Sequence, residues 1–171
     1  IFTRAAPFLT VVFLALLGSA SAGVSLFAAG YFRKGEGTAP GVLGLQYHLF
    51  LASMGFVLVA DDAYAFMVAW ETMALTSYFL VTAQHGIPEI RSAGFLYLLM
   101  AHIGAIAILL SFGILQGGTW LFSFDAMRES TLSTPWATAA FLLALFGFGA
   151  KAGLLPLHVW LPEAHPAAPS P

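Results

Sequence analysis

Five long apolar stretches constrain what this chain can fold into more than any other feature of its sequence. They are Ala5–Tyr31, Val42–Ala60, Ala63–Thr82, Ala93–Leu115 and Pro135–Leu155. Each has the length of a membrane-spanning helix, which needs about 20 mostly apolar residues. Charged residues make up only 8% of the 171-residue chain, whereas a soluble domain carries about 25%. The sequence therefore predicts an all-α, polytopic transmembrane bundle, with residues 1–171 as a single membrane domain.

The first stretch also fits a second interpretation. Arg4, the apolar run from Phe8 and the small residues Ala20-Ser21-Ala22 have the order of a secretory signal peptide and its cleavage site. Apolar character continues to Phe32, well past that site, which favours a spanning helix. We also expect the chain to be a piece of a longer protein, because it starts at Ile1 rather than methionine and stops within a proline-rich segment.

Lysine and arginine residues in the loops indicate the orientation of the predicted bundle, since they are enriched on the cytoplasmic side. One side carries Arg33, Lys34 and Arg91, and the opposite side carries Arg4 and Arg128. The side with Arg33 and Lys34 has the excess, so the sequence places it in the cytoplasm.

Glu71 and Lys151 are the two charges that lie deepest in the apolar stretches. Glu71 is near the centre of the third stretch, where a charge costs about 2.5–3.5 kcal/mol on insertion scales. Lys151 follows Trp136 by 15 residues, roughly 22 Å along a helix, which places it near the middle of the bilayer. Ionisable residues at this depth indicate function. The structural alternatives are a neutral, hydrogen-bonded glutamate and a lysine that snorkels to the interface.

Opposite signs at similar depth predict that Glu71 and Lys151 form a charge pair. A pair lowers the cost of burying each charge, and a nearby carboxylate stabilises the protonated form of a lysine. Moving Glu71 away would then favour release of the proton from Lys151. We interpret this pair as the proton-translocating centre.

The fifth stretch ends in an interrupted helix. Lys151 is flanked by Gly149 and Gly153, and Pro156 follows shortly afterwards. Irregular backbone at membrane depth survives only where protein or a water-filled cavity covers it. The sequence therefore predicts a water-accessible break beside the lysine, followed by a loop over residues 156–171.

Other polar residues near these charges are candidates for moving protons. His102 in the fourth stretch and His158 after the break are candidate relays, with a structural, hydrogen-bonded histidine as the alternative for each. We interpret His48 as structural. Asp61 and Asp62 are expected to cap and solvate a turn, with proton uptake as the alternative.

The sequence predicts no metal, cofactor or redox centre. The chain has no cysteine, which excludes thiolate metal sites and cysteine-ligated iron–sulfur clusters. His158, Glu163 and His165 match no known metal-ligand spacing. The net charge of −2 argues against a nucleic-acid partner. Any electrons would travel in another subunit.

Two segments together resemble the proton-pumping, antiporter-like subunits of respiratory complex I, multisubunit sodium/proton antiporters and membrane-bound hydrogenases. Trp70–Leu80 resembles the glutamate helix of this family. The second segment resembles the lysine-bearing broken helix of the family, in the run Ala150-Lys151-Ala152-Gly153-Leu154-Leu155-Pro156-Leu157-His158. This run is most similar to the hydrogenase-4 and formate hydrogenlyase members. The resemblance covers essentially the whole chain.

The resemblance implies a bundle of about 14 or more helices with inverted repeats, of which this chain would hold one helix and most of the first repeat. It also implies that Glu71 is the switching carboxylate and Lys151 the proton carrier. In some complex I relatives a charged residue follows the glycine of the fourth span. Here Gly104 is followed by Ala105, so that role would be absent or shifted to His102.

We therefore expect a proton-translocating, non-redox membrane subunit of a complex-I-like respiratory complex in the inner (plasma) membrane. Its expected partners are other membrane subunits, the lipid bilayer and protons. One alternative is a subunit of a multisubunit Na+/H+ antiporter, which would move sodium as well and need no redox partner. Another is a structural membrane anchor, against which the two deep charges count.

Overall fold

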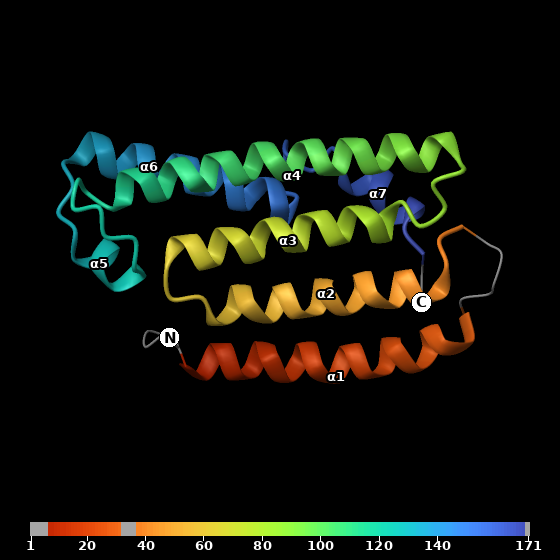
Figure 1. Ribbon diagram of the computed structural model, residues 1–171. Helices are drawn as coiled ribbons and strands as arrows, with labels where there is room; N and C mark the ends of the chain where they lie inside the picture. Colours follow the sequence, from red (N-terminus) through yellow and green to blue (C-terminus); the bar gives the residue numbers. More distant parts are fainter. Residues whose placement is uncertain (1–6, 32–36, 170–171) are drawn as a thin grey trace.

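This computed structural model describes residues 7–31 and 37–169. Within them the chain forms seven helices joined by turns and loops. They are α1 (Pro7–Tyr31), α2 (Pro40–Val59), α3 (Ala63–Val81), α4 (Pro88–Leu115), α5 (Phe124–Glu129), α6 (Thr134–Ala152) and α7 (Leu161–Ala167). Helices α1, α2, α3, α4 and α6 are long and apolar enough to cross a membrane. These five lie roughly side by side (Figure 1). The prediction of an all-helical transmembrane bundle is confirmed.

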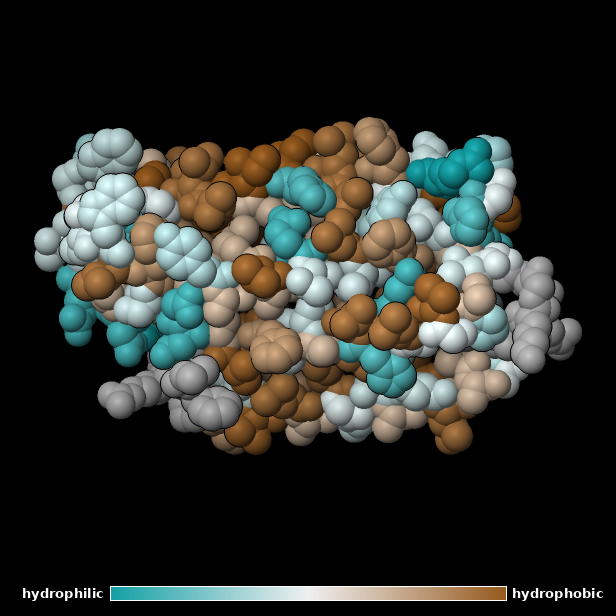
Figure 2. All heavy atoms as spheres, in the orientation of Figure 1, coloured by the Kyte–Doolittle hydropathy of each residue, from teal (hydrophilic) through white to brown (hydrophobic). Residues whose placement is uncertain are grey.

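Apolar side chains cover much of the outside of the bundle, as Figure 2 shows for one face. Leu26 on α1 is 82% exposed, Val68 on α3 is 70% exposed and Phe95 on α4 is 67% exposed. Helices that are apolar on their outer as well as their inner faces are typical of membrane spans. The surface thus agrees with the composition: these helices belong in lipid.

Proline and a short acidic side chain determine where several helices begin. Pro40 and Pro88 lie in the first turns of α2 and α4, where the missing N–H removes no hydrogen bond. The carboxylate of Asp62 accepts a hydrogen bond from the Ala65 amide at 2.8 Å and so caps α3. The start at Ala93 predicted for the fourth spanning helix is wrong, because α4 already begins at Pro88.

The two short helices lie in connecting segments. Helix α5 follows the loop after α4, and the hydroxyl of Ser123 caps it by accepting a hydrogen bond from the Ala126 amide. Helix α7 falls within residues 156–171, so the loop predicted there is wrong over Leu161–Ala167. Pro162 lies in the first turn of α7, a position where proline favours a helix start.

Helix α1 runs without interruption through Ala20–Ala22. It packs against α2, where the Tyr47 hydroxyl donates to the Ser21 carbonyl at 3.5 Å. Arg4, Arg33 and Lys34 lie outside the described residues. The signal-peptide interpretation and the orientation of the bundle depend on them, so both stay predictions.

The core of the bundle lies where α3, α4 and α5 meet. Its buried members are Ala63, Trp70, Met73, Ala105, Ile108, Phe112 and Met127. Phe66 stacks on Trp70 with ring centroids 5.4 Å apart, and Phe148 of α6 meets the same indole edge-on at 5.6 Å. Aromatic pairs in these geometries contribute about 0.5–1.5 kcal/mol beyond the area they bury. These rings fix how close α3 and α6 can approach.

Helices α4 and α6 pack closely through small residues. A Cβ atom on Gly147 would lie 2.6 Å from the Gly104 carbonyl oxygen and 2.5 Å from Cγ1 of Ile108. Further along α4, the buried Ser111 hydroxyl donates to the Ala140 carbonyl of α6 at 2.9 Å. Small residues and interhelical hydrogen bonds are the usual means of helix association in lipid, where apolar burial supplies no driving force.

We expect Gly147→Ala to destabilise the protein by about 1–3 kcal/mol, because the added methyl forces α4 and α6 apart. Gly113→Ala is the control, since a Cβ there meets nothing within 4 Å. Thermal unfolding of the full-length protein in detergent measures both. Equal melting temperatures for the two variants would contradict the close-packing interpretation.

Candidate functional site

Glu71 and His102 face each other across α3 and α4. Glu71 lies near the middle of α3 and His102 near the middle of α4. The His102 Nε2 atom is 3.4 Å from Oε2 of Glu71. The glutamate side chain is 33% exposed and the histidine 46% exposed. Two ionisable groups at mid-helix are therefore within ion-pair distance of each other.

The pair lines a groove of about 450 Å³ on the surface of the bundle. Glu71, Thr72 and His102 are its polar residues, and the remaining lining is Met67, Val68, Leu75, Ala105, Ile106 and Leu109. Figure 2 shows a small hydrophilic area amid hydrophobic side chains over α3 and α4. Glu71 and His102 are thus ionisable groups in an apolar surrounding, where an uncompensated charge is costly.

The hydrogen bonding of His102 leaves its Nε2 atom free to face Glu71. Its Nδ1 atom is 2.9 Å from the Leu98 carbonyl oxygen. A carbonyl can only accept, so Nδ1 carries a hydrogen in this contact. The Nε2 atom of His102 faces the Glu71 carboxyl group at 3.4 Å, and an imidazole and a carboxyl group can each hold or release a proton.

Lys151 lies in the last turn of α6 and finds its partner on α4. Its ammonium Nζ donates to the Tyr97 hydroxyl at 2.7 Å and lies 4.9 Å from the centroid of the Tyr97 ring. Tyr97 is buried, with 4% of its surface exposed. The C-terminal end of a helix also favours a cation, because its carbonyls carry partial negative charge. The lysine therefore has a neutral hydrogen-bond acceptor and a helix terminus beside it.

The structure does not contain the predicted direct pair between Glu71 and Lys151. No ion pair within 4 Å joins the two residues in the described part of the chain. Glu71 faces His102, and Lys151 faces Tyr97. Bulky rings of α3 and α6 meet between the helices, including Trp70, next to Glu71 in sequence. Helix α4 contacts both α3 and α6 and offers each charge its own partner.

The interruption after Lys151 is well defined. Helix α6 ends at Gly153, which adopts a left-handed conformation (φ +71°) that glycine accommodates without strain. The indole Nε1 of Trp160 donates to the Ala150 carbonyl at 2.8 Å, so a carbonyl of the last turn gains a partner from beyond the break. Trp160 also meets Tyr97 edge-on at 5.2 Å. The break and the lysine's partner are parts of one packed unit.

His158, the other candidate relay, and His48, which we interpreted as structural, have different surroundings. His158 lies in the turns between α6 and α7, and its buried Nδ1 has no hydrogen-bond partner among the described residues. No hydrogen bond links it to Lys151 in this part of the structure. His48 donates from Nδ1 to the Gly44 carbonyl at 2.7 Å, as a structural histidine does.

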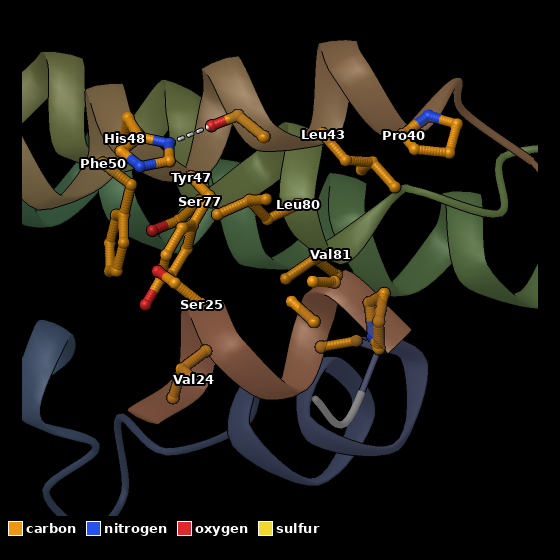
Figure 3. Close-up of a pocket in the computed structure, with 15 residues that line it drawn as sticks. Val24, Ser25, Pro40, Leu43, Tyr47, His48, Phe50, Ser77, Leu80 and Val81 are labelled. Atoms are coloured by element: carbon orange, nitrogen blue, oxygen red, sulfur yellow. Dashed lines mark hydrogen bonds between the residues drawn. The ribbon is translucent and has the colours of Figure 1, made fainter. Parts of the chain in front are cut away.

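A larger cavity, of about 480 Å³, lies between α1, α2, α3 and the segment after α7 (Figure 3). Its polar side chains are Ser25, Tyr47, His48 and Ser77. Among the described residues, no acidic side chain, lysine or arginine lines it, so it is separate from the Glu71–His102 groove and from Lys151.

Sequence reasoning missed Tyr97 and Trp160. Tyr97 precedes Lys151 by 54 residues, and nothing in an apolar stretch indicates which residue will face another helix. A tyrosine hydroxyl at spanning depth was the only available signal, because a buried hydroxyl needs a partner.

The chain matches the family described as NADH:quinone oxidoreductase/Mrp antiporter, TM, over residues 60–171. The chain belongs to this family. Hydrogenase-4 component B of Escherichia coli (strain K12) is 45% identical over 146 residues, which cover 85% of this chain and 22% of that protein. NADH-quinone oxidoreductase subunit N of Desulfitobacterium hafniense (strain DSM 10664 / DCB-2) is 31% identical over 128 residues, covering 72% of this chain and 26% of that protein.

A solved structure of similar fold is a chain of the membrane-bound sulfane sulfur reductase (MBS), an archaeal respiratory membrane complex. It is 33% identical, with a TM-score of 0.58, over 71% of this chain and 20% of that chain. The chain thus spans about a quarter or less of these antiporter-family proteins. The resemblance found in the sequence is confirmed, and the protein is a multi-pass membrane protein.

We expect Trp160→Phe to destabilise the protein by about 1 kcal/mol, because the Ala150 carbonyl loses its indole donor. Trp136→Phe removes the same atoms from a side chain that is 60% exposed and is the matched control. Thermal unfolding of the full-length protein in lipid nanodiscs measures the difference. If the two variants melt alike, the indole does not stabilise the helix end.

Proposed function

We propose that the chain forms part of a proton-translocating subunit of a complex-I-like respiratory complex, of the hydrogenase-4/formate hydrogenlyase or NADH:quinone oxidoreductase type. In this proposal, electron transfer in partner subunits drives proton movement through the membrane subunit. The relation to hydrogenase-4 component B and to NADH-quinone oxidoreductase subunit N supports it. The partners are other membrane subunits of such a complex, and the location is the inner (plasma) membrane.

The Glu71–His102 contact is the observation that carries the proposal. The two groups are 3.4 Å apart at mid-helix, and the contact of His102 Nδ1 with the Leu98 carbonyl leaves Nε2 facing the carboxyl group. A silent anchor would gain nothing from such a pair, since ionisable residues at this depth are expensive. Two adjacent groups that can each hold or release a proton suit proton transfer.

Lys151 is the second proton carrier in this proposal. It lies beside the helix break, and irregular backbone at membrane depth is tolerated where protein or a water-filled cavity covers it. His158 is the candidate relay on that side, because its buried, unpartnered Nδ1 offers a bonding position for a water molecule. Protons would pass between the Glu71–His102 pair and Lys151 by side-chain movement or through water, since the two charges do not touch.

A subunit of a multisubunit Na+/H+ antiporter is the second candidate function. The family description names the Mrp antiporter beside the quinone oxidoreductases. Sodium-dependent transport without electron transfer would favour this second function over the first. Proteoliposomes in sodium-free and sodium-containing buffer, with and without electron donor, distinguish the two.

We expect Glu71→Ala or Lys151→Ala, in the full-length subunit within its complex, to reduce proton transport at least about tenfold while electron transfer persists. Each change removes a group that must carry or stabilise a proton. Glu89→Ala is the control, because Glu89 lies exposed in the first turn of α4. Proteoliposomes with a pH-sensitive dye report transport. Unchanged transport in the Glu71/Lys151 double variant would end this proposal.

His102→Gln tests the proton-holding partner separately. Glutamine keeps a polar side chain but cannot carry the proton, so we expect transport to fall roughly tenfold. His85→Gln is the matched control, since the His85 side chain is exposed in the turn before α4. The same proteoliposome assay applies. Equal rates for the two variants would show that Glu71 works without His102.

A further inference from the structure

The geometry points to Tyr97 as the positioning residue of Lys151: its hydroxyl holds the lysine ammonium at the end of α6, apart from Glu71. This inference rests on the proposed proton-carrying role of Lys151. It assigns a function to a residue on a different helix from either charge.

The contacts around Tyr97 favour a fixed position over a chance encounter. The Nζ–Oη distance is 2.7 Å, the short length expected when an ionised donor meets an oxygen acceptor. Tyr97 is 4% exposed, so its ring cannot turn away into solvent. Trp160 packs edge-on against that ring and bonds to the carbonyl of Ala150, which precedes Lys151. Tyr97, Trp160 and the end of α6 therefore hold one another in place.

The phenol is a neutral acceptor, and this determines how it acts on the lysine. A hydrogen bond from an ammonium to a neutral oxygen stabilises the charged form. It does so less than a carboxylate would, because no opposite charge is present. Tyr97 thus orients the ammonium through a hydrogen bond without placing a second charge beside it.

The other titratable groups near Lys151 leave Tyr97 as its hydrogen-bond partner in the described part of the chain. On α3, Glu71 faces His102. Between α6 and α7, His158 makes no hydrogen bond to Lys151 among the described residues. On α7, His165 contacts the ring of Trp160.

The position of Tyr97 on α4 explains the separation of the two charges. Tyr97 and His102 are five residues apart, which is roughly 7.5 Å along a helix and about 140° around it. One therefore faces α6 and the other faces α3. The same helix holds Lys151 on one side and Glu71 on the other.

Tyr97→Phe tests the inference, because it removes the hydroxyl and keeps the ring that packs on Trp160. The assay is proton transport against pH, with electron transfer measured in parallel, in the full-length subunit within its complex. Without its acceptor the ammonium is no longer held at the end of α6. We expect proton transport to fall about tenfold at every pH, the cost of losing a hydrogen bond to a charged group, while electron transfer persists.

Tyr64→Phe is the matched control, since the Tyr64 side chain is 62% exposed on α3 and its ring meets Phe122. We expect its profile to superimpose on that of the unmodified protein. A Tyr97→Phe profile that also superimposes would overturn the inference. Failure of the proposed function is distinguishable, because Lys151→Ala would then leave transport intact whatever happens at Tyr97.

A second measurement does not depend on transport. Thermal unfolding is compared for Tyr97→Phe in two backgrounds, with Lys151 present and with Lys151→Met. If the hydroxyl acts through the ammonium, Tyr97→Phe lowers the melting temperature at least twice as much when Lys151 is present. Equal decreases in the two backgrounds would show that Tyr97 contributes to packing alone, and would overturn the inference.

Discussion

A charged side chain inside a lipid bilayer needs a partner, because no water is available there to solvate it. Glu71 and Lys151 meet this requirement separately. His102 faces the glutamate, and the Tyr97 hydroxyl accepts from the lysine. Both partners belong to α4, which also packs against α3, α6 and α7. Any displacement of α4 against its neighbours would alter both contacts together.

The same requirement explains how the chain can interrupt a helix at depth. Backbone carbonyls at a helix end lose their intrahelical partners, and lipid cannot replace them. Gly153 ends α6 without strain, and the Trp160 indole takes the Ala150 carbonyl. Lys151 lies in that last turn, where the helix terminus favours a positive charge. The break and the charge therefore stabilise each other.

Close packing determines which residues can reach one another. Gly104 and Gly147 let the backbones of α4 and α6 approach, and this brings Tyr97 within hydrogen-bond distance of Lys151. Between α3 and α6 the larger rings of Trp70 and Phe148 meet instead. Small side chains on one side of the bundle and large ones on the other thus keep the lysine nearer to α4 than to α3.

The sequence by itself determined the membrane location, the five spanning segments, the family and the depth of Glu71 and Lys151. These follow from segment length and composition, which are local properties. Only the tertiary structure decided that Lys151 meets Tyr97 and that Glu71 meets His102. Charge sign and depth do not specify the direction in which a side chain points around its helix. That direction depends on helix rotation and on the size of the residues at each contact, which arise when the helices pack together.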